Sequence, residues 1–425
     1  MYLRNLKRQW LITVVSLFWL AYPNVSAAIN LSTATQRTLE QNPQLQLYPY
    51  HVRAIDGQLI QASLKPNPRM NIDLEDALGT GDTRFLAGSE LTLSLSQVLE
   101  LGNKIEKRMD VVDQQSEALQ RDYAIKRLDV VASMMRDYYD TLRLQYLIEW
   151  NEQRIKSENE ALQVIKHRAK AGVVGQADVM RMELRLAKSQ AKQAQLTSEH
   201  LNSLHVLSAN WFDKPDFDKV EGVLSSLPKI PSDVVMKAAL KETPEYLLSA
   251  ANSRINEARL SLAKAESKAD VTVGAGIRRL EATNDNALVF SFSMPLQWND
   301  RNQGNIASAH AQYEETLATQ EILIKQLEIA LGRIQVSMKS NLHHLERLQS
   351  ELQPVADSLL SEVKRGYQLG QYGVLQWVDA QDELFNFERE RIEAQHAVHL
   401  QFLELERLTG NNLISVITQD AAIKE

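Results

Sequence analysis

The chain of 425 residues contains no cysteine. Thiolate metal sites, cysteine catalysis and disulfides are therefore excluded, and we expect no lipid attached through an N-terminal cysteine. Proline (11) and glycine (16) are scarce, and residues 69–214 contain no proline. The net charge of −7 is spread thinly along the chain, so nothing indicates a nucleic-acid partner. The dominant residues, Leu, Ala, Gln, Glu, Lys and Arg, are typical of proteins built from long helices.

The first residues have the pattern of a secretory signal peptide. Basic side chains come first, at Arg4, Lys7 and Arg8. An apolar run from Trp10 to Ala21 follows, and small residues lead up to Ala27, so we expect cleavage after Ala27. A retained membrane anchor is the alternative, but the apolar run is short for a membrane span. No later stretch is long and apolar enough to span a bilayer, so we expect an exported chain without a transmembrane helix.

The stretch from Leu101 to Ala171 predicts one very long helix, roughly 105 Å at 1.5 Å per residue. Its apolar residues recur at alternating steps of three and four, which indicates a coiled-coil seam. The seam consists of Leu128, Val131, Met135, Tyr138 and Leu142. A turn with Gly172 and Gly175 follows, and a second helical run returns. The pattern predicts a helical hairpin over about 102–210, too long for a compact domain.

The second half of the chain repeats this plan. Its long helical run ends at Gly370 and Gly373, each 198 positions after the corresponding glycine of the first half. A returning helix follows, so we expect a second helical hairpin over about 299–409. Pro354 falls inside this second long helix, where we expect a kink or a local break.

Each half also contains two segments in which apolar and polar residues alternate, the period of a β-strand. The apolar positions of the first pair are Met70, Ile72, Leu74, Leu91, Leu93 and Leu95. Those of the second pair are Val271, Val273, Ala275, Ile277, Leu288, Phe290, Phe292 and Met294. We therefore expect β-hairpins over about 69–97 and about 270–295.

The predicted organisation is two tandem repeats, each with the order helix, β-hairpin, long helix, helix. The predicted segments are a signal peptide (1–27), a first repeat (28–211), a linker (212–232), a second repeat (233–411) and a C-terminal tail (412–425). The two shorter helices of each repeat together match its long helix in length. Each repeat is therefore predicted to be a rod two helices wide, and the fold class to be mainly α with a small β-barrel part.

The four predicted strands are amphipathic, and four strands cannot close a barrel alone. Open strand edges are not tolerated in lipid, so the strands either form a small sheet in water or are pooled by several chains. An exported chain with helices of about 100 Å favours pooling. Three chains would supply twelve strands, enough to enclose a channel. We expect an oligomeric tube, with a barrel in the outer membrane and a helical cylinder in the periplasm.

Two short motifs lie at equivalent places in the two repeats. Residues 96–104 read Ser-Gln-Val-Leu-Glu-Leu-Gly-Asn-Lys, and residues 295–304 read Pro-Leu-Gln-Trp-Asn-Asp-Arg-Asn-Gln-Gly. Together with the duplicated plan, they resemble the TolC-like outer-membrane factors, and within them the CzcC-like subunits of cobalt–zinc–cadmium exporters. The resemblance implies a homotrimer with a trimeric α-barrel and a shared 12-stranded outer-membrane β-barrel in contact with outer-membrane lipid. It also implies two partners, a periplasmic adaptor (membrane fusion protein) and an inner-membrane proton-driven pump of the RND type.

By the same resemblance, the two glycine turns are the periplasmic tips, where the adaptor docks. Asp178 matches a family position at the closed aperture. After the second turn the family often has two aspartates three residues apart, and this chain has Gln376 and Asp379 there. Three copies of Asp379 would form a ring that attracts cations, although Gln376 departs from the family pattern. The alternative is that Asp178 and Asp379 only cap or solvate the returning helices.

No arrangement of residues indicates catalysis or a bound cofactor. His343 and His344 are adjacent on a helix and point about 100° apart, so they cannot bind one metal ion together. We therefore predict no enzyme activity, no cofactor and no metal site. The expected function is an outer-membrane exit channel of a tripartite efflux system that exports heavy-metal cations. The alternatives are a duct of the same fold for drugs or type I protein secretion, and a periplasmic coiled-coil adaptor without a pore.

Overall fold

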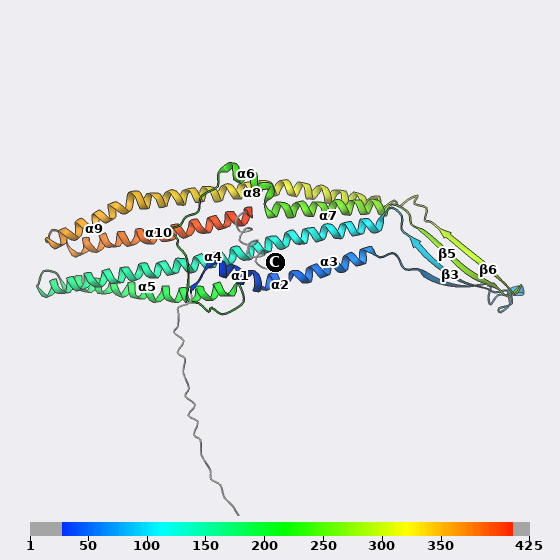
Figure 1. Ribbon diagram of the computed structural model, residues 1–425, viewed down its shortest axis with the longest axis horizontal. Helices are drawn as coiled ribbons and strands as arrows, with labels where there is room; N and C mark the ends of the chain where they lie inside the picture. The colour runs from blue at the N-terminus through cyan, green and yellow to red at the C-terminus, as the bar shows by residue number, and fades with distance from the viewer. Residues whose placement is uncertain (1–27, 411–425) are drawn as a thin grey trace, which may run out of the picture.

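The computed structural model describes residues 28–410. Within them the chain is mainly helical and very elongated, with long helices side by side and four strands extending from one end (Figure 1). The predicted signal peptide with its cleavage after Ala27, and the predicted C-terminal tail, lie outside the described residues.

The helices and strands follow the order predicted for the two repeats. The first half contains β1 (Ala28–Ile29), α1 (Leu31–Gln41), α2 (Pro43–Gln46), α3 (Tyr48–Ser63), β2 (Arg69–Glu75), β3 (Glu90–Leu99), α4 (Lys104–Lys170) and α5 (Gln176–Ala209). The second half contains β4 (Lys219–Val220), α6 (Asp233–Ala239), α7 (Pro244–Glu266), β5 (Val271–Leu280), β6 (Asp285–Ser293), α8 (Gln303–Arg347), α9 (Gln353–Gln368) and α10 (Val374–Thr409). A π-helical turn, Leu348–Leu352, separates α8 from α9.

Helix α4 is the unbroken helix that the proline-free stretch predicts, with 67 residues. All five residues of the predicted seam are buried, which confirms the coiled-coil pattern. Their neighbours are α5 and α1 on one side and α10 on the other, and together they form the largest apolar core. The rod is therefore supported sideways along its length, as a helix this long requires.

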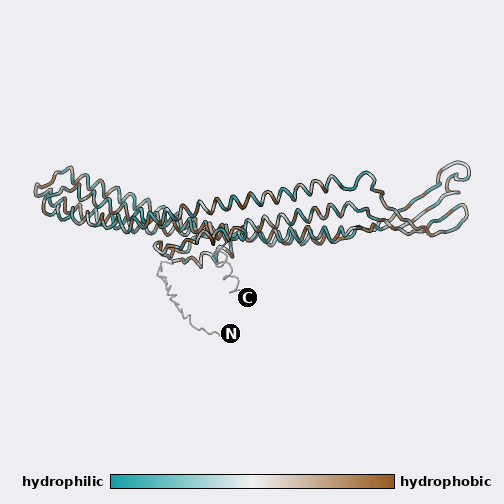
Figure 2. The backbone as a smooth tube through the Cα atoms, turned by 90° about the horizontal axis from the view of Figure 1, so that it is seen from above, coloured by the Kyte–Doolittle hydropathy of each residue, from teal (hydrophilic) through white to brown (hydrophobic). Residues whose placement is uncertain are grey.

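The helices form four columns in one curved layer (Figures 1 and 2). Helices α3 and α5 follow one another along one side of α4, and α7 and α10 follow one another along the other side. Helices α8 and α9 lie beyond α7 and α10 and form one edge of the layer. The column of α3 and α5 forms the opposite edge.

Prolines mark the breaks in the helical columns. The π-helical turn ends just before Pro354, so the predicted local break is confirmed. Proline has no N–H to donate and its ring clashes with the preceding turn, so the regular ladder cannot pass through it. At Pro43 and Pro244 a new helix begins instead. The preceding residues cap these helices, because the Asn42 and Thr243 side chains accept hydrogen bonds from backbone N–H groups of the first turn.

The linker contains a strand that the sequence patterns did not predict. Strand β4 pairs in parallel with β1, and side chains of α4 hold the pair in place. The Tyr138 hydroxyl donates to the carbonyls of Ile29, at 3.1 Å, and of Glu221. The Gln145 side chain forms two hydrogen bonds with the backbone of Val220. Its amide oxygen accepts from the Val220 N–H at 2.7 Å, and its amide nitrogen donates to the Val220 carbonyl at 3.0 Å.

The four long strands form one antiparallel sheet in the order β2-β3-β5-β6. The central pair, β3 and β5, joins the β-hairpin of the first repeat to that of the second. Strands β2 and β6 are the edges, and each has a partner on one side only. Among the helices within residues 28–410, none is long and apolar enough to cross a membrane.

Candidate functional site

The sheet has one apolar face that is open to solvent. The strand register places Met70 opposite Leu95, Leu95 opposite Ala275, and Ala275 opposite Phe290. The next row on the same face of the sheet consists of Ile72, Leu93, Ile277 and Leu288. These rows cross all four strands, and their large side chains are exposed, up to 78% for Phe290. The alternation predicted from the sequence thus becomes a continuous apolar surface that no other segment of residues 28–410 covers.

The opposite face of the sheet is polar and closely packed. Arg278 on β5 donates to Thr92 at 2.9 Å, to Glu90 at 2.6 Å and to Glu75 at 3.2 Å. Glycine is required nearby, because a Cβ at position 276 would lie 2.5 Å from the Leu93 carbonyl oxygen. At the level of these rows the two faces of the sheet therefore differ in polarity, with large apolar side chains on one face and the Arg278 network on the other.

The two glycine turns at the far end of the helices have the same backbone geometry. Gly172 and Gly370 both adopt positive φ angles, 73° and 76°, which a residue with a Cβ rarely does. In the first turn Val173 N donates to the Arg168 carbonyl, and in the second Gln371 N donates to the Gly366 carbonyl. These are Schellman motifs, which satisfy the last carbonyls of a helix. The sequence repeat is therefore also a repeat of turn geometry.

The candidate aperture residues lie just after these turns. Gly175 and Gly373 are the N-cap residues of α5 and α10, which puts Asp178 and Gln376 at the third position of their helices. An acidic or amide side chain at this position interacts favourably with the free N–H groups of the first turn. Asp379 lies one turn further along α10 and is exposed.

Asp178 and Asp379 line the same cavity, of about 330 Å³, between α5 and α10. Four cationic side chains line it as well: Arg154, Arg181, Arg185 and Lys188. The two carboxylates were predicted from the sequence, whereas these cations were not. They lie on α4 and α5, up to 225 positions before Asp379, and only the packing of the two hairpins brings them together.

A buried carboxylate joins the two hairpins above this cavity. Glu158 on α4 is only 1% exposed, and its Oε1 accepts from Arg154 at 2.9 Å and from Arg185 at 3.0 Å. Both arginines also form ion pairs with Asp382 on α10, at 2.9 Å for Arg154. Burial lowers the pKa of Arg185, and the charge of Glu158 opposes this shift. The network fixes α10 against α4 and α5 near the tip.

An aromatic contact joins the tips themselves. The Arg168 guanidinium lies over the Tyr367 ring, 4.1 Å from its centroid, and donates to the Tyr367 carbonyl at 3.1 Å. Tyr367 stacks on Trp377 with ring centroids 5.0 Å apart. Because Arg168 belongs to α4 and Trp377 to α10, the tips of both repeats form one packed unit. In the part of the chain that the structure describes, no three His, Asp or Glu side chains are grouped as a metal site would require.

Comparisons with known proteins agree with this architecture. The family model of the outer membrane efflux protein matches residues 34–211. The chain is 25% identical to the cobalt-zinc-cadmium resistance protein CzcC of Cupriavidus metallidurans, over 86% of each chain. It is 23% identical to the solvent efflux pump outer membrane protein SrpC of Pseudomonas putida, over 76% of this chain and 70% of the relative. The structure of the outer-membrane channel OprN superposes with a TM-score of 0.74, at 17% identity and over 90% of each chain.

These matches confirm the resemblance inferred from the sequence. Residues 34–211 match the outer membrane efflux protein family, and the fold of the chain is that of the TolC-like outer-membrane channels. The family and the structural neighbours are channel proteins, not enzymes.

The buried network makes Glu158→Gln a test of how the tips are held. Loss of this carboxylate leaves two partly buried guanidinium groups to share Asp382, so we expect the free energy of unfolding to fall by ~3 kcal/mol. Urea unfolding followed by circular dichroism measures the change. Glu160→Gln is the matched control, since Glu160 is exposed on the same helix. Equal stability of the two variants would show that the network contributes nothing.

Proposed function

We propose that three copies of this chain form the outer-membrane exit channel of a tripartite efflux system. The observation that carries the proposal is the continuous exposed apolar face of the four-stranded sheet. Soluble monomers rarely expose contiguous apolar surface of this size, and such a patch marks an interaction site. Strands of 7 to 10 residues suit a bilayer when they are tilted. Hydrocarbon is the environment that matches this face.

The ends of the apolar face support a membrane position. Where β6 leaves the sheet toward the helices, Met294, Leu296 and Trp298 remain exposed, with Trp298 at 79%. Tryptophan favours the boundary between lipid and water. The helices then lie in the periplasm, with the glycine turns as the distal tips where the adaptor docks and the inner-membrane pump connects. In this assignment residues 28–211 and 233–411 are the two repeats, and each contributes one β-hairpin and one helical hairpin.

Assembly into a trimer would cover both open edges of the chain. No residue of α3 is buried, and the half of α8 nearest the sheet contains none either. Ile322, Ile329 and Val336 recur at steps of seven on the exposed side of α8, about 180° from the side that faces α7 and α10. Three chains place the α8 edge of one copy beside the α3 and α5 edge of the next.

The strands would close in the same way. With the order β2-β3-β5-β6, strand β6 of one copy would lie antiparallel beside strand β2 of the next. Twelve strands then form a closed barrel without free edges, which is the condition for a sheet in lipid. This surface also disfavours the alternative of a periplasmic adaptor without a pore, because such a protein has no hydrocarbon phase to cover it.

For the cargo we propose heavy-metal cations of the cobalt, zinc and cadmium type. The support is the similarity to CzcC over most of both chains, together with the two motifs at equivalent places in the repeats. A solvent or drug duct is the second candidate, because SrpC is similar over a comparable length. The residues of a passive duct discriminate cargo weakly, so the two candidates are separated by growth experiments.

Engineered cysteines test the proposed subunit contact, since the chain has no cysteine of its own. Leu201 on α5 and His343 on α8 are exposed and lie at similar heights above the tips. We expect Leu201→Cys combined with His343→Cys to give disulfide-linked dimers and trimers on non-reducing gels after oxidation of intact cells.

The matched control combines Leu201→Cys with His344→Cys. His344 is exposed and adjacent, but it points about 100° further round α8. We expect far less cross-linking for this pair. Monomers in both samples would contradict the proposed edge-to-edge contact.

Growth of a deletion strain distinguishes the two cargo classes. We expect the strain to become sensitive to zinc, cobalt or cadmium salts and to remain resistant to solvents, dyes and detergents, with resistance restored by the intact chain. Sensitivity to solvents and dyes alone would replace the metal proposal by the second candidate and leave the channel itself in place.

Asp379 provides a test of the aperture. We propose that three copies of Asp379 line the constriction and favour cations, as acidic rings do in pores. Asp379→Asn should then lower the cation-over-anion selectivity measured in planar bilayers. Asp357→Asn on α9, also exposed, serves as the control. Unchanged selectivity of the Asp379 variant would leave Asp379 as a solvated residue of α10.

A further inference from the structure

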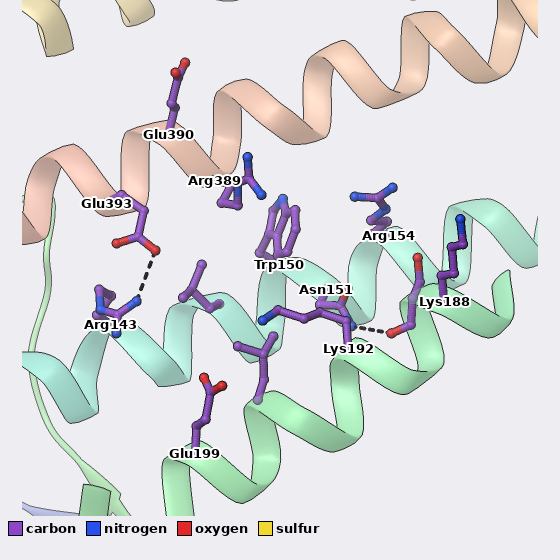
Figure 3. Close-up of a pocket in the computed structure, with 13 residues that line it drawn as sticks. Arg143, Trp150, Asn151, Arg154, Lys188, Lys192, Glu199, Arg389, Glu390 and Glu393 are labelled. Carbon is purple, nitrogen blue, oxygen red and sulfur yellow. Dashed lines mark hydrogen bonds and ion pairs between the residues drawn. The ribbon is translucent and has the colours of Figure 1, made fainter. Parts of the chain in front are cut away.

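A second cavity lies above the tips, between α4, α5 and α10, and has a volume of about 510 Å³ (Figure 3). This volume is in the range that small-molecule sites occupy. The cavity is on the opposite side of α4 from the linker, because Leu147 lines it while Tyr138 and Gln145 hold strand β4. None of the candidate aperture residues lines it.

Cationic side chains outnumber carboxylates in its lining. The cations are Arg143, Arg154, Lys188, Lys192 and Arg389, and the carboxylates are Glu199, Glu390 and Glu393. They come from three helices and from both repeats, so no single stretch of sequence reveals the excess.

The charges are not equally available to a ligand. Arg143 is neutralised by Glu393 at 3.0 Å, and Arg154 belongs to the network around Glu158. Glu199 accepts a hydrogen bond from Gln195, and Glu390 lies at the α10 side of the cavity, so these two carboxylates lower its excess of positive charge without pairing with its cations.

Three of the five cations that line the cavity have no carboxylate partner among the described residues. Lys188, Lys192 and Arg389 form no ion pair with any residue of the described range 28–410. They are therefore available to neutralise the charge of an anionic ligand.

A rigid aromatic residue stands between these cations. Trp150 is buried, and its ring nitrogen donates to the Phe385 carbonyl of α10 at 2.8 Å. Figure 3 shows Arg389 and Arg154 on either side of the Trp150 ring, with Lys192 below it and Lys188 further along α5. The next residue, Asn151, donates to the Ser189 carbonyl at 2.9 Å, so the base of the cavity is fixed to α5 as well.

We propose that this cavity binds a small polyanion, a molecule with two or more carboxylate or phosphate groups. Such groups form strong charge-assisted hydrogen bonds with guanidinium and ammonium groups. Lys192 of α5 and Arg389 of α10 are the main ligand-binding residues, because both are unpaired and they approach from opposite sides. A bound polyanion bridges the two repeats within one chain, so the site does not depend on trimer formation or on the cargo.

Isothermal titration of the full chain in detergent with citrate and with pyrophosphate, at constant ionic strength set with chloride, tests the proposal. We expect saturable binding of at least one of the two, with acetate far weaker. Binding of citrate alone identifies polycarboxylates as the ligand class, and binding of pyrophosphate alone identifies phosphates. The affinity should fall as the salt concentration rises.

Arg389→Gln and Lys192→Gln should each weaken binding by about tenfold, the effect of one charge-assisted hydrogen bond. Because neither side chain is ion-paired, its removal leaves no carboxylate without a partner, and we expect both variants to fold normally. Lys156→Gln is the control, since Lys156 is an exposed cation of α4 outside the cavity, and it should bind as the unmodified chain does. No binding tighter than acetate, or full affinity in both cavity variants, would overturn the proposal.

Discussion

The seam along α4 is the contact on which the rest of the chain depends. Helices α1, α3, α5, α7 and α10 all pack against this one helix, and α8 and α9 are held through α7 and α10. Its five seam residues, from Leu128 to Leu142, are buried where both repeats and the linker meet. Most of the stability of a helix in a protein comes from the packing of its apolar face, so α4 and the helices along its seam stabilise one another. The layer therefore forms as a unit around α4, and within residues 28–410 its two outer columns have neighbours on their inner side only.

The two outer columns are not the only incomplete surfaces. The outer edges of the sheet and one of its faces also lack partners within the described residues. The edge strands β2 and β6 expose unpaired backbone, α3 has no buried residue, and one face of the sheet is apolar and exposed. Each would be a defect in an isolated soluble protein. All of them lie on the surfaces that a closed ring of copies and a surrounding bilayer would cover. The exposed features are consistent with one another, which is the strongest reason to treat them as interfaces.

The periodic parts of the fold were predictable from the sequence, and the contacts between distant segments were not. The seam from Leu128 to Leu142 and the alternation in all four strands determine local structure, and both are confirmed. Pro354 also indicated its break correctly. Strand β4 was missed because two residues held by Tyr138 and Gln145 have no pattern of their own. The cations beside Asp379 and around Trp150 were missed for a related reason, since their helices are brought together only by packing.

The π-helical turn before Pro354 makes the two repeats mechanically unequal. The backbone of α4 is a continuous hydrogen-bonded rod from the sheet to its tip, whereas the equivalent path through α8 and α9 is interrupted at Leu348–Leu352. A ring of three chains would contain six such helical paths. The six would have similar shapes, but the three that contain a π-helical turn would bend more easily than the three formed by α4. Rigid helices (α4) and more flexible ones (α8 with α9) would alternate around the ring. If the end with the glycine turns widens, we expect the three copies of α9 and α10 to move while the three copies of α4 and α5 stay in place, rather than all six hairpins moving equally.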